Sequence, residues 1–424
     1  MTITIRDLKG LVTYIGKNEN TKNVLVVRTP YNAEKYKEWI ENILIRTNSS
    51  VIVQDVRGRY KSKGEWVPYA FEIEDGVELI NYASIIFPDI PIFMVGSSYE
   101  AYTARIAAYY NTKVSGLILR VGVRSQRDIL YFREKLRLSD RVKWMLTHGT
   151  GKFSDFSAFH SLNQKNEEFW KKDISFYEEI MKINLDTLQA QKEDIVYPDC
   201  PVYLITGWKD GFLEGAVSDF KNWSNDDKSL IIGDWDHSLS GKDINKIREN
   251  EWISDRSKFV SSKIKVKYSD IWLERNEITK KQDQNKYILN QKINVAHKNL
   301  YSIYGDINRR PILSAEVSQD IVILEGEEEI LVGVPYINYS DLDVDMYAQL
   351  LKINTTTEVI SNLVLKKEST VAKGTPFAIK KYVGDRYILR ISTTFHPILY
   401  NNHHLEESKH YKGLIESFYI GRMF

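Results

Sequence analysis

The chain contains 424 residues, a length typical of two or three domains. Its 58 basic and 57 acidic side chains leave a formal net charge of +1, which excludes the strongly basic surface of a dedicated nucleic-acid binder. The single cysteine, Cys200, excludes an internal disulfide and a cysteine-based zinc site. Because no apolar run reaches the ~18 residues that span a bilayer, we expect a cytoplasmic globular protein without a membrane partner.

Alternating strands and helices are predicted between residues 20 and 123. Short β-branched runs indicate strands, and apolar residues at helical spacing indicate the helices between them. The predicted strands are Asn23–Thr29, Val51–Val56, Pro91–Val95 and Val114–Val121, and the predicted helices are Ala33–Arg46, Asp75–Phe87 and Ala101–Tyr110. This alternation is typical of a parallel sheet covered by helices.

The pattern is interrupted after residue 123. Residues 124–196 carry amphipathic helical segments and no convincing strand, so we expect a helical cap inserted into the first domain. Strands resume at Val202–Thr206 and Ser229–Gly233. We therefore assign residues 1–123 and 197–262 to one α/β domain.

The last part of the chain has a different pattern. In Leu342–Leu350 apolar and polar residues alternate, which predicts a half-buried antiparallel strand. Similar runs are Ile321–Leu324, Ile330–Val334, Val359–Leu365 and Arg386–Ile391. Residues 263–424 are therefore expected to form an all-β sandwich.

The segment around Ser98 carries the chemistry. A buried strand ends at Gly96 and a helix begins within a few residues, so Ser98 lies at a sharp strand-to-helix turn. Such a turn exposes a serine hydroxyl beside the N–H groups of the helix start. Glu100 stands where the usual G-x-S-x-G pattern has its second glycine, and would either crowd the turn or place a carboxylate in the acyl pocket.

A serine nucleophile needs a base, and the base needs an orienting carboxylate. Asp210 follows the strand Val202–Thr206, and His237 follows the strand Ser229–Gly233. The order Ser98, Asp210, His237 along the chain is that of an α/β-hydrolase triad, and each residue lies at the carboxyl end of a strand.

Several further motifs resemble the cocaine-esterase/NonD branch of the X-Pro dipeptidyl-peptidase-like (S15) serine hydrolases. The segments that carry the resemblance are Arg28–Tyr31 (RTPY), Gln54–Arg59 (QDVRGR), Asp75–Gly76, Ile80–Tyr82, Gly96–Tyr99 (GSSY), Gly207–Gly211 (GWKDG), Asp234–Ser238 (DWDHS), Asp343–Ile353 and Asp385–Ser392. The resemblance implies an α/β-hydrolase domain with an inserted cap and a C-terminal jelly-roll sandwich.

The resemblance also implies roles for individual residues. Ser98 would be the nucleophile, His237 the general base and Asp210 its partner. The Tyr31 hydroxyl and the Tyr99 backbone N–H would form the oxyanion hole.

Trp208 and Trp235 flank the acid and the base, and two interpretations are open. They either wall the acyl pocket together with Glu100, or wedge their loops against the β-sandwich.

These observations favour a serine hydrolase that cleaves an ester or amide bond of a small or peptide-like acyl substrate through an acyl-enzyme. We expect no cofactor, no metal and no nucleic-acid partner, and leave assembly into a homo-oligomer open. The alternatives are an acyltransferase, a tailoring hydrolase or peptidase of natural-product metabolism, and a non-catalytic binding protein with a hydrolase fold.

Overall fold

The structure is a computed structural model. It describes residues 2–132, 135–136, 144, 148, 195–239, 253, 263–268, 271–274, 286–296, 318–324, 329–354, 356–381, 385–393 and 408–422. Most of the expected helical cap, residues 124–196, lies outside the described residues, which include a short helix α4 (Gln126–Leu130) and the strand pair β7 (Tyr131–Phe132) and β8 (Lys135–Leu136) at its beginning. No helix in the described part of the chain is long and apolar enough to cross a membrane.

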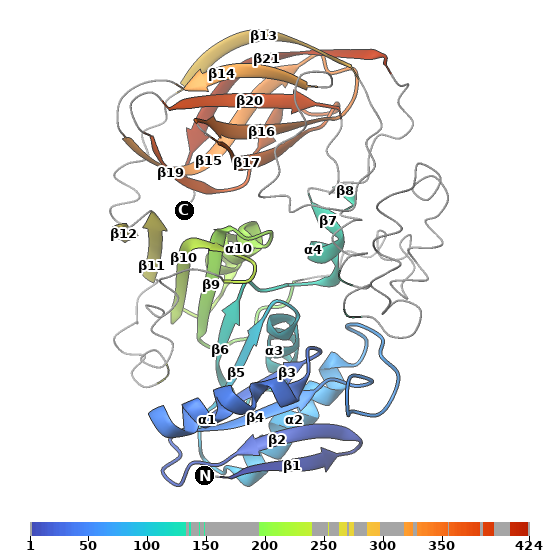
Figure 1. Cartoon of the computed structure of the whole chain (residues 1–424), viewed down its shortest axis with the longest axis vertical. Coiled ribbons are helices and arrows are strands. Elements are labelled where there is room, and N and C mark those ends of the chain that lie inside the picture. Colours follow the sequence, from blue (N-terminus) through green and yellow to red (C-terminus); the bar gives the residue numbers. More distant parts are fainter. Residues whose placement is uncertain are drawn as a thin grey trace.

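A ten-stranded sheet forms the first part of the molecule, with the strand order β1-β2-β4-β3-β5-β6-β9-β10-β11-β12 (Figure 1). All pairs from β4 to β11 are parallel, and β1, β2 and β12 pair antiparallel at the two edges. The strands are β1 (Ile3–Leu8), β2 (Leu11–Gly16), β3 (Asn23–Thr29), β4 (Ser49–Asp55), β5 (Ile92–Ser97), β6 (Val114–Arg120), β9 (Val202–Lys209), β10 (Lys228–Asp236), β11 (Lys263–Tyr268) and β12 (Ile271–Glu274).

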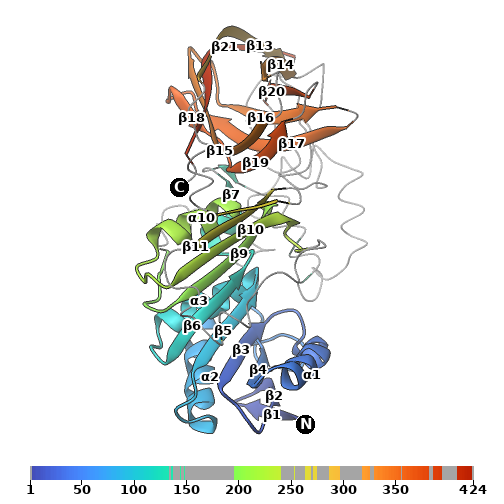
Figure 2. The ribbon, with the colours of Figure 1, turned by 90° about the vertical axis from the view of Figure 1, so that its left-hand side faces the viewer.

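Helices cover both faces of this sheet, because its central strands are apolar on both sides. In β3, Val24 and Val26 face the core under α2 (Glu72–Ile86), α3 (Tyr99–Tyr109) and α10 (Leu213–Asn222). Leu25 and Val27 face the core under α1 (Lys37–Arg46), which follows the short 3-10 helix η1 (Ala33–Tyr36). Figure 2 shows α1 on one side of the sheet and α2 and α3 on the other. The predicted parallel sheet covered by helices is confirmed.

The sheet is wider than the sequence indicated. The β1–β2 hairpin was not among the predicted strands, and β11 pairs in parallel with β10 although it lies beyond the expected domain boundary at residue 262. The strand β12 returns along β11 and ends the sheet. The first domain therefore reaches into the region that the sequence assigned to the β-sandwich.

The C-terminal part consists of two antiparallel sheets packed on each other, which confirms the predicted β-sandwich. One sheet has the order β13-β21-β15-β18, with β19 also pairing with β15, and the other has the order β14-β20-β16-β17. The strands are β13 (Lys286–Ala296), β14 (Ser318–Leu324), β15 (Glu329–Ser340), β16 (Met346–Ile353), β17 (Thr357–Leu365), β18 (Val371–Lys373), β19 (Phe377–Lys381), β20 (Arg386–Ser392) and β21 (His410–Gly421).

The prediction of a half-buried strand at residues 342–350 was wrong in two ways. The strand is β16, which begins at Met346, and it is buried on both faces. Tyr347 and Gln349, expected to face solvent, are 1% and 0% exposed. The Gln349 side chain is satisfied inside the protein, because its Nε2 donates a hydrogen bond to Asn362 Oδ1 at 2.8 Å.

Apolar contacts join the two parts of the molecule. Val332 and Val334 of β15 belong to the same buried cluster as α2, α3 and α10, and Trp208 at the end of β9 packs against it. The sandwich therefore covers the β9–β10 side of the sheet, as Figure 1 shows.

Candidate active site

The turn between β5 and α3 holds Ser98 in a strained conformation. Ser98 is the N-cap of α3 and has φ 56° and ψ −118°, a backbone conformation that non-glycine residues rarely adopt. A glycine is needed beside it, because a Cβ on Gly96 would lie 2.2 Å from the backbone carbon of Glu100. The turn thus forces the serine out of the sheet and permits the close approach of the helix.

The three residues predicted as a triad lie in one hydrogen-bonded chain. His237 Nε2 lies 2.9 Å from Ser98 Oγ, and His237 Nδ1 lies 2.9 Å from Asp210 Oδ1. Asp210 is 2% exposed, whereas the His237 side chain is 42% exposed. The buried carboxylate can hold the imidazole with its proton on Nδ1, which leaves Nε2 free to accept the serine proton.

Thr206 supports the acid and was not identified from the sequence. Its Oγ1 donates a hydrogen bond to Asp210 Oδ2 at 2.9 Å, so each oxygen of the carboxylate has its own partner. The threonine is the last residue of the predicted strand and Asp210 lies in the loop beyond it. That spacing alone does not distinguish a supporting hydroxyl from an ordinary strand residue.

The two residues predicted to supply the oxyanion donors meet in one apolar cluster, in which Tyr99 is buried and against which Tyr31 packs. Tyr99 is the first residue of α3, and the N–H groups of a first helical turn have no acceptor within their own helix. Tyr31 follows the carboxyl end of β3, and its hydroxyl accepts a hydrogen bond from Trp144 Nε1 at 3.3 Å. The role of these two groups as an oxyanion hole stays a prediction.

Aromatic side chains surround this region. The Tyr99 ring stacks on Trp144 with 5.9 Å between centroids, and Phe212 packs on the His237 ring at 5.3 Å. His148 contacts the Tyr31 ring edge-on at 5.0 Å, and burial lowers the pKa of its imidazole to about 4. His148 is therefore neutral at pH 7 and adds a ring rather than a charge to the surroundings of Tyr31.

Glu100 turns away from the serine and into the α/β domain. It is 4% exposed, and it accepts hydrogen bonds from the Tyr36 hydroxyl at 2.5 Å and from the Ser97 N–H at 3.2 Å. Burial raises the pKa of the Glu100 carboxyl. These contacts favour a role in holding the turn over a role in the acyl pocket.

The two tryptophans beside the acid and base also pack into the protein. Trp235 is 1% exposed and lies in the core under α1, and Gly207 and Gly233 leave room for it. Trp208 packs against the cluster that includes residues of β15. Trp208, at the end of β9, thus packs toward the β-sandwich, as the second interpretation expects, whereas Trp235, in β10, packs within the α/β domain and fits neither interpretation.

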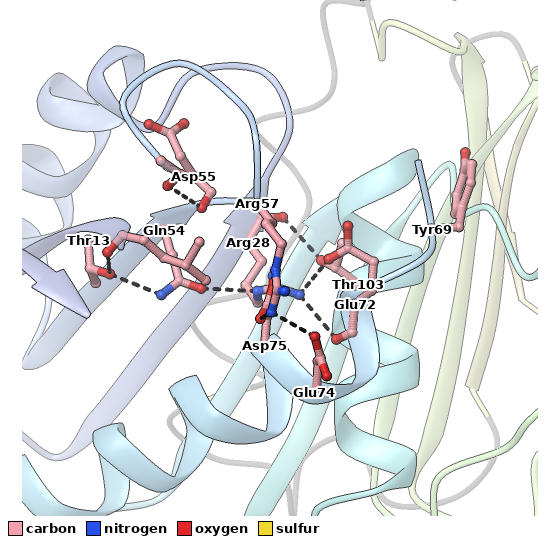
Figure 3. Close-up of polar contacts among 12 residues, drawn as sticks. Thr13, Arg28, Gln54, Asp55, Arg57, Tyr69, Glu72, Glu74, Asp75 and Thr103 are labelled. Atoms are coloured by element: carbon pink, nitrogen blue, oxygen red, sulfur yellow. Dashed lines mark hydrogen bonds and ion pairs between the residues drawn. The ribbon is translucent and has the colours of Figure 1, made fainter. Parts of the chain in front are cut away.

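Residues of the motifs that precede Ser98 in the sequence form a buried network of ion pairs and hydrogen bonds (Figure 3). Arg28 is 0% exposed; its Nη1 lies 2.5 Å from Glu72 Oε2, its Nη2 lies 3.4 Å from Asp75 Oδ2, and its Nε donates to Gln54 Oε1. Arg57 also pairs with Asp75, at 2.5 Å. The network joins β3, β4 and the first turn of α2.

A second set of contacts holds the loop that carries Tyr31. Asp55 Oδ1 accepts a hydrogen bond from the Ala33 N–H at 2.7 Å, and Arg59 Nε donates to the Pro30 carbonyl at 3.0 Å. Asp55 is 0% exposed, and burial raises the pKa of its carboxyl to about 6.

Replacing Asp55 with asparagine is expected to remove a pH-dependent loss of stability. Since the folded-state pKa is about 6 and the unfolded value is 3.8, the folded protein binds this proton more tightly, and stability falls as pH rises from about 4 through about 6. The asparagine side chain would keep the acceptor for the Ala33 N–H without titrating. We expect the melting temperature of Asp55→Asn minus that of the unmodified protein to increase by several degrees between pH 4 and pH 7, as measured by scanning fluorimetry. A difference that is constant across this range would contradict the assignment.

No metal centre is evident in the part of the chain that the structure describes, since no group of three or more His, Cys, Asp or Glu side chains there is placed to hold an ion.

Comparison with known proteins gives a family and a fold. Residues 16–239 match the family described as X-Pro dipeptidyl-peptidase (S15 family). No curated protein matches the sequence. The structure is similar to an aminopeptidase from a marine sediment archaeon of the Thaumarchaeota, with a TM-score of 0.69, 12% identity and coverage of 99% of this chain and 96% of that chain.

A second similar structure is a CocE/NonD family hydrolase from Staphylococcus aureus, with a TM-score of 0.65 and 11% identity. The alignment covers 99% of this chain and 92% of that chain. These similarities extend over both parts of the molecule and confirm the expected α/β-hydrolase fold with its C-terminal β-sandwich.

Proposed function

The chain belongs to the X-Pro dipeptidyl-peptidase (S15) family of hydrolases, and from this membership we propose that it cleaves an ester or amide bond through a Ser98 acyl-enzyme. The observation that carries the proposal is the hydrogen-bonded chain from Asp210 through His237 to Ser98, with 2.9 Å at each step. Its order and its position at the carboxyl edge of a parallel sheet suit nucleophilic catalysis.

In the proposed reaction, Ser98 Oγ attacks the substrate carbonyl while His237 Nε2 takes the hydroxyl proton. The imidazolium that forms is stabilised by the buried Asp210 carboxylate. His237 then protonates the leaving alkoxide or amine, and the acyl group stays on Ser98. Water, deprotonated by His237, releases the acid and restores the serine.

The negative charge that develops on the substrate's carbonyl oxygen has to be stabilised by hydrogen-bond donors. The Tyr99 N–H at the beginning of α3 and the Tyr31 hydroxyl are the groups we propose for this role. The Tyr31 hydroxyl accepts a hydrogen bond from Trp144 Nε1, and a phenol oxygen that accepts one hydrogen bond can also donate its proton in another.

The surroundings favour a small or peptide-like substrate with an apolar acyl group. Trp144 and Phe212 are only partly buried, and each packs against a residue of the proposed machinery, Tyr99 and His237 respectively. Their rings would contribute apolar surface next to the acyl-enzyme.

A fluorophosphonate probe tests the proposal. It should add one phosphonyl group to the intact protein, detected by mass spectrometry, and Ser98→Ala should abolish this addition. The matched control is Ser97→Ala, because Ser97 contributes its backbone N–H to Glu100 and should be labelled normally. Equal labelling of Ser98→Ala would exclude Ser98 as the nucleophile. An unlabelled native protein would exclude the proposed acyl-enzyme and leave a binding protein with a hydrolase fold.

A further inference from the structure

The two donors proposed for the oxyanion come from separate segments of the chain. Tyr31 follows β3, whereas Tyr99 begins α3 after β5. Donors that stabilise an oxyanion must be held within about 0.5 Å of their productive positions. A contact that fixes one segment relative to the other would therefore act on catalysis without touching the substrate.

Glu72 makes such a contact. It is the first residue of α2 and is 3% exposed. Its Oε2 accepts a hydrogen bond from Arg28 Nη1 at 2.5 Å, and its Oε1 accepts one from the Tyr99 hydroxyl at 2.7 Å. Each oxygen of one carboxylate is thus bonded to one of the two donor-carrying segments.

Both ends of this link are firmly held. Arg28 lies in β3, in the segment that leads to Tyr31, and its backbone carbonyl accepts a hydrogen bond from Thr103 Oγ1 in α3 at 3.1 Å. The Tyr99 hydroxyl also accepts a hydrogen bond from the Tyr69 N–H at 2.7 Å. Burial raises the pKa of the Tyr99 phenol well above its usual value, so the phenol keeps its proton and donates it to Glu72.

The hydrogen bond between Glu72 and Tyr99 affects the position of the proposed oxyanion donor, because Tyr99 supplies both the hydroxyl and the backbone N–H. Its hydroxyl is bonded to Glu72 and its backbone N–H directly follows Ser98 in the chain, so a displacement of the phenol would shift the N–H as well. We propose that Glu72 is a positioning residue that holds the Tyr31 and Tyr99 donors at a fixed separation. This inference rests on the proposed acyl-enzyme chemistry, and it adds to it a residue that none of the sequence motifs contains.

Glu72→Gln is the most direct test. A glutamine side chain keeps an oxygen at one of the two carboxylate positions and places an NH2 group at the other, where it cannot accept the hydrogen bond from Arg28 or from the Tyr99 hydroxyl. The matched control is Glu74→Gln, which removes the same charge from the same helix turn. The Glu74 side chain is 62% exposed and pairs with Arg57, which lies in neither of the two segments that contain the proposed oxyanion donors.

The readout is the rate of phosphonylation of Ser98 by the fluorophosphonate, resolved into the maximal rate constant and the probe concentration at half-maximal rate. For Glu72→Gln we expect the maximal rate constant to fall about 10- to 100-fold, since misplacing a donor by about 1 Å has that effect. The half-saturating concentration should change less than about threefold, and Glu74→Gln should match the native protein.

Tyr99→Phe provides an independent variant should Glu72→Gln fail to fold. It keeps the backbone N–H and loses the hydrogen bonds of the phenol to Glu72 and to the Tyr69 N–H. It should therefore show at least the same loss, and adding Glu72→Gln to it should cause no further loss. If the native protein is labelled but Glu72→Gln and Tyr99→Phe react like Glu74→Gln, Glu72 is only structural. If the native protein is not labelled, the proposed function itself fails.

Discussion

Replacing Asp210 with asparagine is expected to lower kcat about 10⁴-fold at neutral pH without unfolding the protein. The physical reason is the tautomer of His237. Thr206 Oγ1 donates a hydrogen bond to Asp210 Oδ2. In the asparagine variant this donor favours the amide oxygen at the Oδ2 position. The amide NH2 would then face His237 Nδ1, so Nδ1 must accept a hydrogen bond and cannot carry the imidazole proton. The proton moves to Nε2, where it faces Ser98 Oγ, and Nε2 can no longer accept the serine proton.

Hydrolysis of a p-nitrophenyl ester series, or the phosphonylation rate where no ester is accepted, measures this effect. Asp234→Asn is a suitable control, because Asp234 lies near the end of β10, shortly before His237, has a side chain that is 52% exposed and pairs with Lys209. We expect this control to stay within about twofold of the native rate. The tautomer argument also predicts that adding Thr206→Val to Asp210→Asn returns part of the activity, because the amide can then turn its oxygen toward His237. A loss below about tenfold for Asp210→Asn would contradict the assigned role.

The largest expected effect on stability comes from Arg105 in α3. Its guanidinium forms an ion pair with Asp219 of α10, and the two side chains are 1% and 3% exposed. Arg105 Nη1 also donates to the Val196 carbonyl at 3.2 Å. Arg105→Met would leave the Asp219 carboxylate buried with Arg124, at 4.0 Å, as its nearest cation. We expect the free energy of unfolding to fall by about 3–5 kcal/mol.

Urea denaturation followed by circular dichroism checks this value, and a double variant separates its cause. In Arg105→Met/Asp219→Leu no carboxylate is buried without its partner, so part of the stability should return. Arg124 keeps its pair with Asp128 at 2.5 Å in both variants. If the single variant costs less than about 1 kcal/mol, the buried pair does not hold α3 against α10.

The central strands could be predicted because they are buried on both faces and rich in β-branched residues. The hairpin β1–β2 was not predicted: β1 has β-branched residues at Ile3–Ile5, but none of its residues is buried. The error in β16 was of the opposite kind, because a buried strand was expected to be exposed on one face. Its alternation of polar and apolar residues is real, but Gln349 has a buried partner in Asn362, and a single sequence does not reveal that pairing.

The site was predicted only where the chain order carries information. Ser98, Asp210 and His237 could be placed because parallel strands bring their carboxyl ends to one edge, and the structure joins the three by hydrogen bonds. Their catalytic roles stay a prediction. Thr206 and Glu72 were not predicted because each is an ordinary polar residue of a strand or helix. The importance of Thr206 comes from the folding of the loop after β9 back onto it, and that of Glu72 from contacts with segments distant in sequence.

The position of Glu100 has a consequence for how such proteins are recognised. A search pattern that demands glycine on both sides of the nucleophile would pass over this chain. The structure shows that the two positions are under different constraints: a side chain at Gly96 would collide with the backbone of α3, whereas the side chain at position 100 bonds Tyr36 inside the domain. Patterns that fix only the first glycine, and accept at the second any residue able to reach a buried donor, would recover hydrolases of this type.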